Sequence, residues 1–208
     1  MKPCSEDTHV ATVKHGRRLE YFTIGWNLIE ALVSIGAGLL AGSIALIGFG
    51  VDSLIETASG TVLLWRLREG ERGEAREPIA RKLVGWSLLA LAAYVGFEAI
   101  KCLVLREEPE RSIPGIIIAA LSLIVMPLLA RAKRRVAAGL KSRAMAADST
   151  QTDICAYLSA ILLGGLGLNA LFGWWWADPI AGLIMVPIIA KEGIEALRGE
   201  TCCDCHGC

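Results

Sequence analysis

Charged residues are scarce in this sequence, and neither sign is in excess. They make up 20% of the 208 residues, with 21 basic and 21 acidic side chains and a formal net charge of zero. A typical soluble domain has about 25% charged residues, and a domain that binds nucleic acid carries a basic excess. The composition therefore argues against a nucleic-acid partner. It also excludes global disorder, because 54% of the residues are hydrophobic.

Other absences narrow the class of protein further. Met1–Arg18 is polar and mixed in charge, so it does not resemble a secretory signal peptide. The short alternating segments of a membrane β-barrel are missing, and so is a hydrophilic domain of any size. No serine-protease, zinc-protease or phosphate-loop motif is found. The sequence therefore gives little support to an intramembrane enzyme that uses paired carboxylates.

The apolar residues are gathered in six blocks. Each is about 20 residues long, which is enough for a helix to cross a bilayer core of about 30 Å. Because backbone polar groups in lipid must be satisfied internally, we expect helices. The sequence thus predicts an all-α bundle of six transmembrane helices over residues 19–198. The blocks are Tyr21–Leu40, Ser43–Trp65, Leu83–Leu105, Ile113–Ala130, Ile154–Phe172 and Trp174–Leu197.

The basic residues predict the orientation of the bundle. Lys and Arg are concentrated before the first span, between the second and third, and between the fourth and fifth. By the positive-inside rule these segments face the cytoplasm, so both termini are predicted to be cytoplasmic. The basic side chains of these segments are Lys2, Lys14, Arg17, Arg18, Arg66, Arg68, Arg72, Arg76, Arg81, Lys82, Arg131, Lys133, Arg134, Arg135, Lys141 and Arg143.

Acidic residues occur inside the predicted spans. A charge at the centre of a membrane helix costs roughly 2.5–3.5 kcal/mol on insertion scales. Lys101 can reach Glu98 at a spacing of three residues, but no other acid has an obvious basic partner. Either a mobile cation or protons neutralise the interior, or each acid is protonated and hydrogen-bonded. The acids are Glu30, Asp52, Glu56, Glu98 and Asp153, with Asp148 just before the fifth block.

Asp52 and Glu56 form the sharpest pattern. They lie four residues apart in the middle of a span, so both project from one helix face and could share a divalent ion. In the first span, Asn27 and Glu30 are three residues apart and could line the same cavity.

The fifth helix offers two alternatives for completing such a site. Asp148, Gln151 and Cys155 form one stripe, and Ser149 with Asp153 forms another. Carboxylate, amide oxygen and thiolate suit zinc or a later first-row metal better than calcium. A buried membrane cysteine is also commonly a small hydrophobic residue, which is the simpler interpretation of Cys155.

These residues resemble the cation diffusion facilitator (cation efflux) family. The resemblance is carried by Gly42–Glu56, by Ala147-Asp148, and by Ala177–Leu183 with its Ala-Asp-Pro start. It implies six spans, a metal site between the second and fifth helices, homodimers, and exchange of metal for protons. The acid pair of the family falls on Asp52 and Glu56.

The fifth helix departs from the family, which has His or Asp and then Asp. Here those places fall on Gln151 and Cys155 without a gap, or on Ser149 and Asp153 with one. The family also commonly has a cytoplasmic C-terminal domain. This chain runs only about ten residues past the sixth span, so the resemblance covers the transmembrane domain alone.

Residues 199–208 form a Cys/His-rich segment, which we expect to be cytoplasmic like the N-terminal segment 1–18. Four thiols and one imidazole could capture a soft metal ion without a fold, and the alternative is an unselected tail. The residues are Cys202, Cys203, Cys205, His206 and Cys208.

The sequence therefore predicts a multi-pass protein of the plasma (inner) membrane that exports a divalent metal by proton antiport. Zinc is favoured, and cobalt, cadmium, iron and manganese are possible. No tightly bound cofactor is expected, and the partners are lipid, metal ion, proton and a second copy in a homodimer. The altered fifth helix motivates the alternative of a metal-binding, regulatory membrane protein that does not transport.

Overall fold

The computed structural model describes residues 4–69, 77–140 and 142–198. These ranges contain six helices and no strand, which confirms the predicted all-α class. The helices are α1 (Cys4–Ala41), α2 (Ile44–Glu69), α3 (Glu77–Leu105), α4 (Ile113–Leu140), α5 (Arg143–Phe172) and α6 (Ala177–Arg198).

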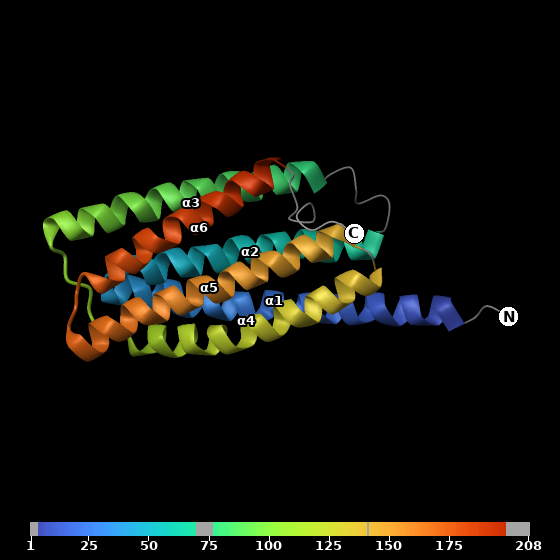
Figure 1. Cartoon of the computed structure of the whole chain (residues 1–208), viewed down its shortest axis with the longest axis horizontal. Helices are drawn as coiled ribbons and strands as arrows, with labels where there is room; N and C mark the ends of the chain where they lie inside the picture. The colour runs from blue at the N-terminus through green and yellow to red at the C-terminus, as the bar shows by residue number, and fades with distance from the viewer. Residues whose placement is uncertain (1–3, 70–76, 141, 199–208) are drawn as a thin grey trace, which may run out of the picture.

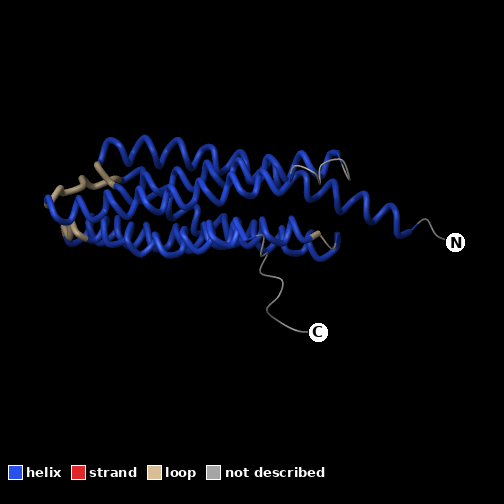
Figure 2. Tube along the Cα trace, turned by 90° about the horizontal axis from the view of Figure 1, so that it is seen from above, coloured by secondary structure: helices blue, strands red, loops and turns tan. Residues whose placement is uncertain are grey.

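The helices run along one long axis and alternate in direction. In Figure 1, α3 and α6 lie along one edge, α1 and α4 along the other, and α2 and α5 between them. α1 packs on both α2 and α4, and α5 packs on α4, α2 and α6. Figure 1 shows that the start of α1 and the end of α6 point to the same end of the bundle, and Figure 2 shows the same elongated bundle turned by 90°. That end also holds the basic residues Lys14, Arg17, Arg18 and Arg131, as the predicted topology requires.

Five of the helices are long and apolar enough to cross a membrane: Ala11–Ala41, Ile44–Trp65, Gly85–Leu105, Ile113–Leu140 and Met145–Phe172. α6 has 22 residues but carries Asp178 near its start and Lys191 and Glu192 near its end. It lies antiparallel to α3 and packs against it, so it completes the bundle. Large apolar side chains such as Leu32, Leu40, Val104 and Leu171 point outward, as lipid contact requires. The chain is an integral, multi-pass membrane protein.

Several helices extend beyond the predicted blocks. α4 continues to Leu140 instead of ending at Ala130, and α5 begins at Arg143 instead of Ile154. The apolar count stopped early because both extensions are rich in charged and hydroxyl side chains. Ser142 caps α5 by accepting a hydrogen bond from the Met145 amide, so polar residues form its first turns.

Small residues allow close packing within the bundle. A Cβ on Gly38 of α1 would lie 3.0 Å from the Ile47 nitrogen of α2, and one on Gly50 would lie 3.0 Å from the Ile35 nitrogen. The register of these two helices follows from such contacts. Gly50 faces Ser34 and Gly60 faces Ile24, which places Asn27 at the level of Glu56.

Candidate metal path in the bundle interior

Polar side chains line the inner face of α1. They recur at a spacing of three or four residues, which keeps them on one helix face. All are at most 1% exposed, in a bundle that is otherwise apolar. They are Glu20, Thr23, Asn27, Glu30 and Ser34.

α2 and α5 bring further polar groups against this face. On α2 they are Asp52, Ser53 and Glu56, and the predicted pair is buried as the four-residue spacing requires. On α5 the buried stripe is Asp148, Thr152, Cys155 and Ser159. The first of the two proposed stripes, with Asp148 and Cys155, therefore faces inward, and Thr152 belongs to it.

Glu56 is held by Thr152. The Thr152 hydroxyl donates to Glu56 Oε1 at 2.8 Å, while Glu56 Oε2 is buried without a hydrogen bond. Asp52 lies one turn away and is 4% exposed. Glu192 of α6 is near enough to interact electrostatically with both carboxyl groups. Carboxyl groups are thus concentrated in the middle of the bundle.

Glu30 forms a second centre near the first. Ser53 donates to its Oε2 at 2.9 Å, and Ser122 of α4 donates to its Oε1. Trp26 Nε1 in turn donates to Ser122 Oγ at 3.3 Å. The Cys155 thiol lies 4.0 Å from Glu30 Oε2, so α1, α2, α4 and α5 meet at this carboxylate.

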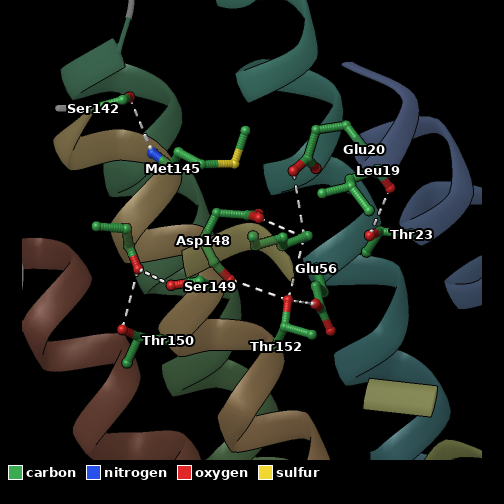
Figure 3. A network of polar contacts seen from close by, with 12 residues as sticks. Leu19, Glu20, Thr23, Glu56, Ser142, Met145, Asp148, Ser149, Thr150 and Thr152 are labelled. Carbon is green, nitrogen blue, oxygen red and sulfur yellow. Dashed lines mark hydrogen bonds and ion pairs between the residues drawn. The ribbon is translucent and has the colours of Figure 1, made fainter. Parts of the chain in front are cut away.

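Lys133 corrects the prediction that Asp148 has no basic partner. It was assigned to the basic rim between the fourth and fifth spans, but the extension of α4 places it inside the bundle, fully buried. Its ammonium contacts Asp148, lies 3.5 Å from Glu20 Oε1 and donates to Thr152 Oγ1 at 3.2 Å. Figure 3 shows Glu20, Asp148 and Glu56 converging on this region, with Thr152 between the last two.

Two other acids are paired at the periphery. Arg134 contacts both oxygens of Asp153, at 2.5 and 3.4 Å, on a face where the Arg134 side chain is 54% exposed. Asp153 therefore points away from the interior, and the second predicted stripe does not face Asp52. Lys101 Nζ lies 2.9 Å from Glu98 Oε2, which confirms the pairing predicted from their spacing.

The remaining predicted residues that the structure describes are buried or half-buried. Both polar atoms of the Asn27 side chain are buried without a hydrogen bond, at the level of Glu56. Gln151 is half-buried at the edge of the inward stripe. Ser149 is buried and donates to the Ala146 carbonyl at 2.6 Å. The tail residues from Cys202 to Cys208 lie outside the described residues.

Among the described residues, no three His, Cys, Asp or Glu side chains gather closely enough to hold a metal ion. The donors are instead spread along the bundle axis, from Glu20 and Asp148 through Glu56 and Asp52 to Glu30 and Cys155. We call these six residues the acidic path. Hydroxyl groups and Lys133 donate to Glu30, Asp148 and Glu56 Oε1, whereas Glu56 Oε2 and both Glu20 oxygens are buried without a hydrogen bond.

Three residues of this region were missed by the sequence interpretation: Glu20, Thr152 and Lys133. A helical-face plot could have found Glu20, since it lies seven residues before Asn27, and Thr152, since it lies four after Asp148. Lys133 gave no comparable signal, because it is one of several basic residues in Arg131–Arg135 and only contact with α1 and α5 distinguishes it.

A membrane bundle with a carboxylate-lined interior defines a class of protein, and comparison with known sequences gives the family. Residues 21–200 match the cation efflux transmembrane domain, so the chain belongs to the cation efflux family.

Three curated relatives are 26–28% identical to this chain. The chain is 28% identical over 178 residues to an uncharacterized transporter of Methanocaldococcus jannaschii, covering 81% of this chain and 62% of that protein. It is 26% identical over 200 residues to an uncharacterized transporter of Synechocystis, covering 90% and 63%. A cadmium, cobalt and zinc/H⁺-K⁺ antiporter of Bacillus subtilis is 27% identical over 195 residues, covering 84% and 57%. The chain thus spans about three-fifths of the length of these relatives.

Proposed function

We propose that this protein moves a divalent transition-metal cation out of the cytoplasm in exchange for protons. The observation that carries the proposal is the buried pair Asp52 and Glu56 on α2, facing the inward stripe of α5 with one Glu56 oxygen unpartnered. Buried carboxylates in a membrane bundle are costly unless a cation or protons compensate them. Family membership and the relatives named as antiporters support the same assignment.

The donor set favours a soft or borderline metal. Asp52, Glu56 and Glu30 supply carboxylate oxygens, and Cys155 supplies a sulfur within 4.0 Å of Glu30. Thiolate ligands select zinc and related ions over magnesium, calcium or manganese. We therefore propose zinc, cadmium or cobalt as cargo before manganese or iron. The protein binds no resident cofactor in this proposal, and its function is transport without catalysis.

Protons are the natural counter-ion because the ligands must be deprotonated to bind metal. Acid on the far side would protonate Asp52 and Glu56 and release the ion. Rocking of the bundle between two states would then expose the site to each side in turn. A homodimer in the plasma (inner) membrane, with the Cys/His tail capturing metal, completes the proposal.

The deciding experiment is metal uptake into proteoliposomes, with zinc, cadmium, cobalt and manganese, with and without a pH gradient. Uptake of zinc that is stimulated by an opposing proton gradient is the expected result. The Asp52→Ala, Glu56→Ala double variant should abolish it. Glu98→Gln is the matched control, since Glu98 is a span carboxylate paired with Lys101 at the periphery. Unchanged uptake by the double variant would overturn the assigned site.

A second candidate is a metal-binding protein that does not transport. It is motivated by α5, whose inward stripe places Thr152 and Cys155, and no His or Asp pair, opposite Asp52 and Glu56. Zinc binding to the purified protein, without any uptake into the same vesicles, would establish this alternative in place of transport.

A further inference from the structure

The buried ammonium of Lys133 stands out within the acidic path. It contacts Asp148 of α5, lies 3.5 Å from Glu20 of α1 and donates to Thr152. The Thr152 hydroxyl in turn donates a hydrogen bond to Glu56 of α2. One lysine on α4 is therefore connected to acidic groups on three other helices.

The inward position of Lys133 differs from that of a basic residue that anchors a helix at the membrane surface. The next residue, Arg134, has such an anchoring orientation. Its guanidinium reaches outward to Asp153, where long basic side chains lie at a membrane surface. Lys133 points the opposite way and is 0% exposed. Burying an ammonium is unfavourable unless partners compensate it, so the acids of α1 and α5 hold it there.

The carboxyl groups around Lys133 outnumber its single ammonium. Glu20, Asp148 and Glu56 present three carboxyl groups to one ammonium. Oxygens of each are buried without a hydrogen bond: both of Glu20, Oδ1 of Asp148 and Oε2 of Glu56. Carboxylate oxygens are ligands for divalent metals, so these unpartnered oxygens, once deprotonated, offer a divalent ion more ligands than a single ammonium uses.

Lys133 lies between the basic end of the bundle and the central acid pair. It occupies the half of the bundle nearest the basic end. The Thr152 hydroxyl accepts a hydrogen bond from its ammonium and donates one to Glu56. A cation arriving from that end and bound for Asp52 would pass Glu20 and Asp148. The ammonium occupies the place that such a cation would take. Lysine has a flexible four-carbon stem, which allows the ammonium to leave without unfolding the helix.

We propose that Lys133 is a tethered stand-in for the cargo, and that Glu20 and Asp148 form a first binding station for a divalent cation. The ammonium fills this station while the path is empty. An arriving metal ion displaces it from Asp148, and its return behind the ion closes the path toward the cytoplasm. Lys133 is thus a positioning residue, and the inference rests on the proposed transport function.

The first test measures zinc binding and zinc uptake for Lys133→Met in the full chain. Zinc chloride should bind at least tenfold more tightly by calorimetry, because no tethered cation competes for Asp148. Uptake at saturating zinc should fall at least fivefold, because the ion is no longer displaced from the station. Arg134→Met is the matched control and should stay within twofold of the unsubstituted protein in both measurements. A purely structural lysine would lower both binding and uptake.

A second measurement uses the unsubstituted protein, so it does not depend on a variant that folds. An amine-reactive acetylating reagent is applied with and without saturating zinc, and modification is read by mass spectrometry. Lys133 should be protected without zinc and modified at least fivefold more with it, while the exposed Lys101 reacts equally in both.

The outcomes separate this inference from the proposed function. Equal modification of Lys133 in both conditions, or a Lys133→Met variant indistinguishable from Arg134→Met, would overturn the stand-in role while leaving transport intact. An unsubstituted protein that binds no zinc would contradict the proposed function, and with it the station.

Discussion

Thr152 of α5 donates a 2.8 Å hydrogen bond to Glu56 Oε1 of α2, and it accepts one from Lys133 at 3.2 Å. A single hydroxyl therefore connects the central acid pair to the buried lysine. This makes the hydroxyl of Thr152 a sensitive point of the acidic path.

Thr152→Val should destabilise the protein and weaken zinc binding. Valine keeps the shape but removes the donor, and leaving a buried polar group unpaired costs about 1–3 kcal/mol. Thermal unfolding in detergent and zinc calorimetry measure the two effects, and Thr152→Ser should restore both. Thr150→Val is the control, because the Thr150 hydroxyl donates only within its own helix, to the Ala146 carbonyl at 3.2 Å. Equal effects of the two valine variants would contradict a specific role for Thr152.

Cys155→Ser should change which metal is preferred. The thiol lies beside Glu30, and replacing sulfur by oxygen favours harder metals. We expect the ratio of cadmium to manganese uptake to fall at least fivefold. Cys102→Ser is the control, since the Cys102 thiol lies 3.0 Å from the Glu107 carbonyl near the outer end of α3. If the ratio is the same in both variants, Cys155 is a packing residue.

Gly193→Ala should loosen the contact between α3 and α6. A Cβ there would lie 3.0 Å from the Gly85 carbonyl oxygen and 3.1 Å from Leu88 Cβ. Overpacking of this kind costs about 1–3 kcal/mol. Gly167→Ala meets nothing within 4 Å and should stabilise α5 by about 0.5–1 kcal/mol through helix propensity. Opposite shifts in thermal unfolding temperature are expected, and a shift of the same sign in both would refute the close packing.

Ser43→Ala should lower stability without changing zinc affinity. The Ser43 hydroxyl donates to Asp178 Oδ1 at 2.6 Å and accepts from the Leu46 amide, so it ties α6 to the first turn of α2. Loss of a helix cap alone costs about 1 kcal/mol. This contact lies near the Gly42 turn, at the end of the bundle away from Lys133. A clear drop in zinc affinity would show that the tie also shapes the metal path.

Periodicity predicted those parts of the structure that depend on one helix at a time. The apolar blocks predicted six helices, and spacing alone placed Asp52 with Glu56 on one face and Lys101 beside Glu98. The partners across helices depend on how each helix is rotated against its neighbours. Counting from the family pattern led to Gln151, whereas rotation against α2 brings Thr152 inward.

Lys133 illustrates the same limit for charge. In the sequence it is one basic residue among Arg131, Arg134 and Arg135, and the positive-inside rule treats them alike. The structure turns Lys133 inward because Glu20 and Asp148 are within its reach, and turns Arg134 outward toward Asp153. The helix face on which a basic residue lies decides whether it sets the topology or enters the interior. A count of charges per loop carries no information about that face.

The length of α4 between Lys133 and Ser122 has an electrical consequence. At about 1.5 Å per residue these side chains are roughly 16 Å apart along the helix, and a bilayer core is about 30 Å thick. Ser122 contacts Glu30, so an ion that moves from Lys133 to Glu30 crosses about half of the membrane. One elementary charge gains or loses about 2.3 kcal/mol per 100 mV over the whole membrane. In the proposed transport, a divalent ion on this half-path works against roughly 2.3 kcal/mol per 100 mV, and its outward movement should slow as the inside becomes more negative.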